Sequence, residues 1–238
     1  MAGENVDAIR FDGVRKTFGR VVAVDRVDIA VPSGSFVGLI GHNGAGKTTC
    51  LRMLMGLLRP SEGTVRVLGL DVVAEPLEAR RRLGAVPDEP AIYEWLTARE
   101  FLELVASVRG EGNVGQALEL AALGGDADRP VREYSQGMRR RTALAAALLG
   151  RPAVIVLDEA LNGLDPPTAA RVKAVLRAAV DEGRTVLLST HVVETVAAVA
   201  DRVILLARGR VVADERTATL GPRGLEALFL ERMDASAR

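Results

Sequence analysis

The stretch Gly41-His42-Asn43-Gly44-Ala45-Gly46-Lys47-Thr48 decides the fold of this chain. It matches Gly-x-x-x-x-Gly-Lys-Ser/Thr, a loop whose glycines let successive backbone N–H groups point at phosphate oxygens. The apolar run Phe36–Ile40 before it predicts a buried strand, and residues 49–55 after it predict the first turns of a helix. A glycine-rich turn without a ligand is the alternative, which the flanking strand and helix disfavour. The sequence therefore predicts a nucleoside triphosphate site between a strand and a helix.

The main chain of this loop and the N-terminus of the following helix are expected to bind the nucleotide. The predicted contact residues are Gly41, Asn43, Gly44, Ala45, Gly46, Lys47, Thr48 and Thr49. Lys47 is expected to reach the β- and γ-phosphates, and Thr48 to bind the Mg²⁺ that bridges them. We assign no role to the side chain of His42, because the backbone does the binding in such loops.

Length and composition limit the class of protein. With 238 residues the chain allows one large α/β domain or a domain with an inserted subdomain. The net charge is zero, so no global field attracts nucleic acid. The single cysteine, Cys50, rules out an internal disulfide and is expected to be a small buried hydrophobic residue. We see no signal peptide and no apolar run long enough to span a membrane, so a membrane-spanning part would belong to another chain.

Apolar strands alternate with helices over the second half of the chain. These strands and helices are predicted at 154–157, 168–182, 185–188, 192–200 and 202–206. Such alternation indicates a mainly parallel sheet with right-handed crossovers. The first part of the chain is predicted to be β structure, with strands at 27–31 and 64–68. Residues 90–150 form a helical insertion in this α/β core, and Thr97–Glu100 is a capping-box pattern.

Two carboxylates and a histidine follow predicted strands. Asp158 and Glu159 end the apolar strand 154–157, and a buried parallel strand delivers such residues to the ligand edge of its sheet. Asp158 is expected to hold Mg²⁺ or its water, and Glu159 to accept a proton from, or orient, the water that attacks the γ-phosphate. An acidic solvated turn is the alternative. His191 follows another strand, where a contact to the γ-phosphate and an ordinary surface or core histidine both remain open.

The segment Tyr134–Met138 precedes three arginines and a helix rich in Ala and Leu. Ser135 is expected to cap that helix, and a helix N-terminus is a second possible anion site. By itself this element is more typical of an ordinary helix cap.

Taken together, the phosphate loop, the helical insertion, the Ser-Gln-Gly element, the Asp-Glu strand and the later histidine resemble the ATP-binding cassette of ABC transporters over nearly the whole chain. The resemblance implies a single α/β domain: a P-loop NTPase core with a mainly parallel sheet, an N-terminal antiparallel β subdomain and an inserted helical subdomain. The implied boundaries are a core at 1–89 and 151–215, a helical signature subdomain at 90–150, and a C-terminal tail at 216–238.

The resemblance also implies roles for single residues. Ser135 and Gly137 match the signature motif, which in this family contacts the γ-phosphate of ATP held by the opposite subunit. Residues 161–165, Leu-Asn-Gly-Leu-Asp, match the D-loop. His191 matches the switch histidine and is expected to be catalytic together with Glu159. Phe18 stands where an aromatic ring stacks on adenine.

The chain departs from the family pattern at three positions. Gln136 and Met138 alter the signature motif, and Asp88 stands where the Q-loop has glutamine. We place Asp88 at the nucleotide site, near Mg²⁺, without assigning it the role of the glutamine. Tyr93 and Trp95, in a chain with 3% aromatic residues, are expected either to anchor a docking groove or to hold the helical insert against the core.

The signature and D-loop look like those of exporter ATPases encoded separately from their permease, as does the segment Leu225–Leu230. This resemblance implies a Mg-dependent ATPase at the cytoplasmic face of the membrane. Its implied partners are a membrane-spanning permease and a second, identical cassette, and no nucleic acid is expected. One alternative is a soluble ABC ATPase acting on nucleic acid or ribosomes. Another is a small-molecule kinase, which leaves the signature and D-loop unexplained.

Overall fold

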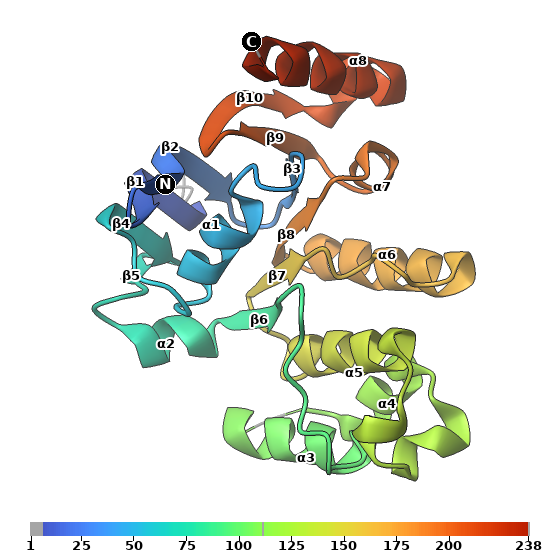
Figure 1. The fold of residues 1–238 in the computed structure, drawn as a ribbon. Coiled ribbons are helices and arrows are strands. Elements are labelled where there is room, and N and C mark those ends of the chain that lie inside the picture. Colours follow the sequence, from blue (N-terminus) through green and yellow to red (C-terminus); the bar gives the residue numbers. More distant parts are fainter. Residues whose placement is uncertain (1–6, 111, 238) are drawn as a thin grey trace, which may run out of the picture.

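The computed structural model describes residues 7–110 and 112–237, and its centre is a six-stranded sheet (Figure 1). Five neighbouring strands run parallel, and the edge strand β10 is antiparallel to β9. The order across the sheet is β10 (Arg210–Arg216), β9 (Arg202–Ala207), β3 (Phe36–Ile40), β8 (Thr185–Thr190), β7 (Val154–Asp158) and β6 (Leu83–Val86). The predicted parallel sheet is confirmed, because these strands are buried apolar runs with helices on both faces.

A second sheet of four antiparallel strands lies beside the first (Figure 1). Its order is β2 (Val21–Pro32), β1 (Asp7–Phe18), β4 (Glu62–Val67) and β5 (Leu70–Asp71). The helix α1 (Lys47–Leu54) packs between the two sheets. Its Cys50 and Leu51 are fully buried there with Phe11 of β1 and Val156 of β7. Burial raises the pKa of the Cys50 thiol to about 12, so this residue is a packing group.

The opposite face of the parallel sheet is covered by α5 (Gln136–Leu148), α6 (Pro166–Asp181) and α7 (Val193–Ala197). Two glycines in the sheet allow close helix approach. A Cβ on Gly38 of β3 would lie 2.2 Å from the side chain of Val196 on α7. A Cβ on Gly84 of β6 would lie 1.9 Å from the carbonyl oxygen of Ala147, which brings the end of α5 against the sheet.

The helices of the predicted insertion gather at the β6 end of the sheet (Figure 1). They are α3 (Ala98–Arg109), α4 (Val114–Ala121), the short 3₁₀ segments η1 (Gly124–Asp128) and η2 (Val131–Glu133), and α5; α2 (Pro76–Arg81) precedes β6. The predicted capping box is present: Glu100 N donates to Thr97 Oγ1 at 3.1 Å, and Thr97 N donates to Glu100 Oε2 at 2.8 Å. Apolar side chains of these helices join those of α6 and α7 in one core.

The last helix, α8 (Thr217–Ala237), packs on α7, β9 and β10. Gly221, with φ of +63°, interrupts its helical backbone near the start. Leu225 and Phe229 are the buried residues of its inner face. The helix α7 is shorter than predicted and ends at Ala197. Among the described residues, no helix has the length and apolar character that crossing a bilayer requires.

Candidate nucleotide site

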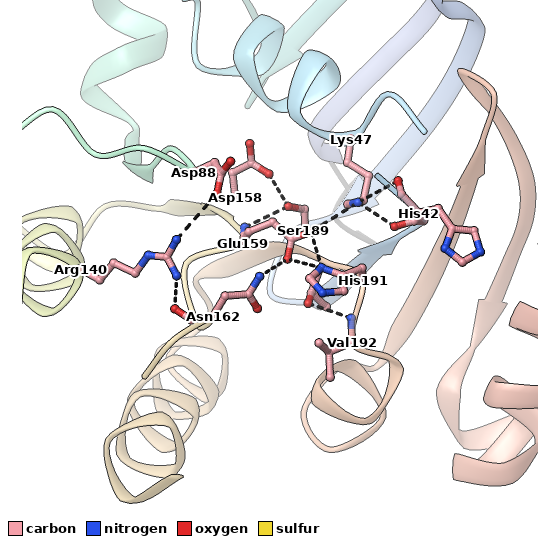
Figure 2. Close-up of polar contacts among 12 residues, drawn as sticks. His42, Lys47, Asp88, Arg140, Asp158, Glu159, Asn162, Ser189, His191 and Val192 are labelled. Carbon is pink, nitrogen blue, oxygen red and sulfur yellow. Dashed lines mark hydrogen bonds and ion pairs between the residues drawn. The ribbon is translucent and has the colours of Figure 1, made fainter. Parts of the chain in front are cut away.

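Four neighbouring parallel strands end at the same edge of the six-stranded sheet. There β3 leads into the phosphate loop, β8 into His191, β7 into Asp158 and Glu159, and β6 into Asp88. Open α/β sheets bind ligands at the carboxyl ends of their strands. Figure 2 shows these side chains at that edge, with Glu159 and Ser189 between Asp88 and Lys47. The fold therefore brings together the residues that the sequence placed after separate strands.

The phosphate loop adopts the backbone that its glycines permit. Gly44 and Gly46 have φ values of +82° and +106°, which disfavour residues with a Cβ. A Cβ on Gly46 would also lie 2.7 Å from the carbonyl oxygen of Ala23, and one on Gly41 would lie 2.4 Å from that of Leu206. Gly46 is the N-cap of α1 and offers no side-chain cap. The start of α1 is thus suited to an anion.

Lys47 is the buried cation of the site, with 5% of its surface exposed. Its Nζ donates to the carbonyl oxygens of Gly41 at 2.7 Å and His42 at 3.3 Å. The same atom lies 3.4 Å from Glu159 Oε1. A buried ammonium group requires such partners, and these hold it beside the loop. Around it, Ala45 is buried, Thr48 and Thr49 are half-buried, and Asn43 and Gly44 are exposed.

Asp158 is a buried carboxylate that is 1% exposed. Ser189 lies opposite it in the register of β7 and β8, and the Ser189 hydroxyl donates to Asp158 Oδ1 at 2.5 Å. Burial raises the pKa of Asp158, hydrogen bonds from Ser189 and Thr48 act against this, and the charges of Asp88 and Glu159 raise it further. The ionised carboxylate is therefore disfavoured by its surroundings, and a nearby cation would stabilise it.

Glu159 begins the turn after β7 in an unusual backbone conformation. Its φ is +50°, in the left-handed region, which costs a non-glycine residue about 1–3 kcal/mol. Its N–H donates to the carbonyl oxygen of Ser189 at 3.1 Å and to Ser189 Oγ at 3.2 Å. These bonds to the neighbouring strand hold the strained turn, which directs the side chain toward Lys47 and His191 (Figure 2).

The carboxylate of Glu159 has three polar partners. His191 Nδ1 lies 3.2 Å from both of its oxygens, Asn162 Nδ2 donates to Oε2 at 2.8 Å, and Lys47 is the third. Burial raises the pKa of Glu159, but the contacts from His191, Lys47 and Asn162 outweigh it, and the net pKa lies below the ordinary value. Asp158 and Glu159 are thus adjacent carboxyl groups with opposite pKa shifts, an arrangement that separates two chemical roles.

The signature residues lie apart from this cluster, on the surface. Ser135 is exposed and caps α5, with its Oγ accepting from Met138 N at 3.3 Å. Gly137 is half-buried, and a Cβ there would be in ordinary contact, 3.9 Å from the Gly163 carbonyl oxygen and from Ser135 Oγ. Within the described chain the predicted helix cap is present, and the side of α5 that begins at Ser135 faces outward.

Asp88, Phe18 and His42 have separate surroundings. Asp88 Oδ1 lies 3.9 Å from Nη2 of Arg140 on α5. Phe18, at the end of β1, is 50% exposed, and Lys16 Nζ lies 5.2 Å from its ring centroid. The ring of His42 packs against Phe229 of α8 with centroids 5.0 Å apart at 61°.

Three contacts of the site were not predicted from the sequence. Ser189 holds Asp158, Asn162 holds Glu159, and Arg140 donates through Nη1 to the carbonyl oxygen of Asn162. Asn162 belongs to the D-loop motif, and this motif could have indicated that Asn162 is a residue of the site. Ser189 follows from the strand register, and Arg140 from the position of α5, neither of which the sequence specifies locally.

Comparison with known proteins identifies this arrangement. A family model described as ABC transporter matches residues 24–162. The chain belongs to the ABC transporter family. Daunorubicin/doxorubicin resistance ATP-binding protein DrrA of Streptomyces peucetius is 40% identical over 239 residues, covering 97% of this cassette and 72% of that protein. Nod factor export ATP-binding protein I of Mesorhizobium japonicum is 38% identical over 213 residues, covering 87% of this cassette and 63% of that protein.

Solved ABC cassettes share the fold. MJ0796, a cassette solved as a dimer in a post-hydrolysis state bound to ADP and Pi, aligns with a TM-score of 0.81 at 26% identity. The alignment covers 88% of this cassette and 98% of that chain. The predicted family and the α/β class, with a mainly parallel sheet, an antiparallel N-terminal sheet and added helices, are confirmed. This cassette is an ATP-binding ATPase of the ABC transporter family.

Proposed function

We propose that this cassette powers export through a separately encoded membrane permease, as one of two cassettes that close over ATP. The observation that carries the proposal is the Glu159 carboxylate, which lies 3.4 Å from Lys47 of the phosphate loop and 3.2 Å from His191. A carboxylate at that place, with a lowered pKa, is ionised at neutral pH and suits a base or an orienting group for attacking water. The names of two relatives, a resistance protein and an export protein, support the exporter class.

The oxygen atoms beside the phosphate loop are suitable ligands for a magnesium ion. The Thr48 hydroxyl contacts the Asp158 carboxylate, and both groups are hard oxygen ligands of the kind that Mg²⁺ prefers. A cation would also favour the ionised form of Asp158, which burial disfavours. We propose that Thr48 and Asp158 hold this ion, which when bound supplies neutralisation of phosphate charge.

The chain's own groups divide the remaining work. With ATP bound, Lys47 Nζ would donate to phosphate oxygens in place of one of the loop carbonyl oxygens. The backbone N–H groups from Gly41 to Thr49 would bind the phosphates. Glu159 would orient a water molecule and accept its proton, while His191 contacts that carboxylate and the γ-phosphate. Phe18 offers an exposed ring for adenine. Asp88, whose charge already acts on Asp158, stays near the ion.

Dimer closure accounts for the exposed signature residues. Ser135 is exposed and Gly137 half-buried at the start of α5, where backbone N–H groups favour an anion. We propose that they contact ATP bound by a second, identical cassette. ATP then bridges the two chains, and its hydrolysis lets them separate.

A groove between the core and the helical subdomain suits the permease. It has a volume of about 480 Å³ and includes Leu57, Ala85, Pro87, Ile92 and Phe101 among its lining residues. Leu57 is 62% exposed there, and Tyr93, 65% exposed, packs edge-on against Phe101. Apolar residues exposed around a hollow are typical of protein interaction sites.

We propose that segment 88–100 transmits motion from the site to this groove, with Tyr93 and Trp95 as anchors. The segment connects the end of β6 to the start of α3. In this division, residues 1–89 and 151–215 act as the nucleotide-binding core, 90–150 as the moving helical subdomain, and 216–238 as a C-terminal element. The cassette is then a peripheral protein on the cytoplasmic face of the cell membrane, and no nucleic acid takes part.

The test is co-purification of a tagged Glu159→Gln chain from detergent-solubilised membranes with Mg-ATP. A polytopic membrane protein recovered with this chain, and recovered less with Lys47→Ala, supports the proposal. Recovery in the soluble fraction with ribosomes or nucleic acid contradicts it and favours a soluble ABC ATPase.

A further inference from the structure

Arg140 connects the signature helix to two other segments of the site. It lies on α5, five residues after Ser135. Its Nη1 donates to the carbonyl oxygen of Asn162 in the D-loop, and its Nη2 lies 3.9 Å from Asp88 Oδ1 (Figure 2). The guanidinium therefore joins the helical subdomain to the ends of β7 and β6, with 22% of its side chain exposed.

Asn162 continues this connection to the Glu159 carboxylate. Its side-chain Nδ2 donates to Glu159 Oε2 at 2.8 Å, and its backbone N–H donates to the Glu159 carbonyl oxygen at 3.1 Å. A shift of the D-loop at Asn162 must therefore move or release the carboxylate. Because the turn at Glu159 is strained, its side chain depends on such outside contacts for its position.

The backbone of the D-loop lies in close contact with the guanidinium. Gly163 follows Asn162 with φ of +72°, and a Cβ there would lie 3.6 Å from Arg140 Nη1. The helix that carries Arg140 also carries Ser135 at its start, and Thr142 Oγ1 donates back to Met138 O at 2.9 Å within it. Ser135 and Arg140 therefore belong to one helix, and a displacement of its start also moves the Arg140 backbone.

We infer that Arg140 is a positioning residue that couples the contacts of the signature helix to the placement of Glu159, acting through Asn162. The inference rests on the proposed function, because it needs Glu159 to act on the attacking water and α5 to meet a second cassette. Arg140 then does not touch the nucleotide. It holds Glu159 in place through the D-loop, so a contact that displaces α5 also displaces the carboxylate, and hydrolysis in one chain depends on the surface that meets its signature helix.

A structural role for Arg140 is the competing explanation, because the same contacts fasten the helical subdomain to the core. The two explanations differ in a double-mutant cycle of Arg140→Gln and Asn162→Ala. If Arg140 acts through Asn162, each single change lowers kcat about tenfold, and the double variant is little worse than either. If the two residues act separately, the losses multiply to about a hundredfold.

The experiment measures kcat, KM and nucleotide dissociation constants for the purified chain and its variants. The expected result is a fall in kcat with KM and nucleotide binding within about twofold of the original chain. Arg139→Gln is the matched control, since Arg139 is the adjacent arginine and contacts Glu94 and Arg132 rather than the D-loop. Arg140→Lys, which keeps a charge and a donor, is expected to recover part of the lost activity.

Three outcomes overturn the inference: unchanged kcat in Arg140→Gln, multiplying losses in the double variant, or an equal loss in Arg139→Gln. Thermal unfolding of each variant identifies a chain that has failed to fold, and Arg140→Lys then replaces Arg140→Gln in the cycle. Failure of the proposed function has a different signature: the Glu159→Gln chain would then recover no membrane protein, or would turn over ATP like the original chain, whatever occupies position 140.

Discussion

The edge of the parallel sheet and the start of α5 differ in how far their functional groups are buried and have polar partners within one chain. At the sheet edge Lys47, Asp158 and Glu159 are each less than 9% exposed, and every one has polar partners within the chain. At the start of α5, Ser135 is exposed and Gly137 is half-buried. The first region is preorganised by folding, whereas the second leaves a helix terminus at the surface. The comparison separates the binding of ATP, for which one chain holds the groups, from its hydrolysis, which we propose needs two chains.

The largest effect is expected at the sheet edge for Glu159→Gln. The amide keeps the size of the side chain but removes the proton acceptor, so kcat for ATP should fall about 1,000-fold while ATP binding persists. Closed dimers should accumulate with Mg-ATP and be visible by size-exclusion chromatography. Glu226→Gln, on the exposed side of α8, is the control. Turnover close to that of the original chain would show that Glu159 is not the acceptor.

A smaller loss, in binding rather than turnover, is expected for Lys47→Ala. Removal of a charge-assisted phosphate contact should raise the dissociation constant for ATP about 100-fold, measured by calorimetry. Lys173→Ala on α6 removes a lysine away from the site and should leave binding unchanged. Equal affinities of the two variants would contradict the role of Lys47.

The start of α5 should respond differently to Ser135→Asp. Aspartate still caps the helix, so folding is kept, but its charge opposes a phosphate approaching from another chain. Hydrolysis should fall about 30-fold, with ATP affinity of the single chain unchanged.

Mixing Ser135→Asp with Lys47→Ala chains sharpens this comparison further. If one site combines the loop of one chain with the α5 terminus of the other, the mixed dimer contains one intact site and activity returns. A mixture as inactive as its components would place both elements in the same chain's site.

The smallest effect is a gain in stability from Asp158→Asn. The raised pKa means that the folded chain binds this proton more tightly than the unfolded chain, so ionised Asp158 destabilises the fold above its folded-state pKa. The amide should therefore increase the free energy of unfolding by about 1 kcal/mol at neutral pH. The gain should shrink as the pH falls through that pKa. Denaturant unfolding at two pH values measures it, with Asp181→Asn at the exposed end of α6 as control; a loss of stability at neutral pH would refute it.

The sequence predicted the components of the sheet edge better than the contacts between them. Each predicted residue follows its own strand, and parallel strands deliver their ends to one edge, so local patterns sufficed to place Lys47 and Asp158 there. For His191 the local pattern left two interpretations open, and the family resemblance assigned it. The Ser189–Asp158 bond depends on the register of β7 and β8, and the Arg140–Asn162 contact on the packing of α5, which are tertiary properties. Such contacts leave no periodic signal in a single sequence.

Two further elements, β1 and α8, were not identified individually from the sequence. β1 pairs with β2 through several register shifts, which disrupt the alternation that normally identifies a strand. The segment after 216 was predicted only as a tail, whereas α8 occupies it and Phe229 reaches His42. His42 was given no side-chain role, and its packing against α8 is structural rather than chemical.

That packing also gives the cassette a spectroscopic readout. The chain has two histidines, and both lie at the edge where nucleotide is proposed to bind: His42 in the phosphate loop and His191 after β8. Phe229, 5.0 Å from the His42 ring, shifts the imidazole proton resonances of His42 through its ring current, whereas those of His191 are set by the neighbouring Glu159 carboxylate. The aromatic region of a proton NMR spectrum therefore distinguishes movement of α8 at one end of the site from changes around Glu159 at the other, without an added label.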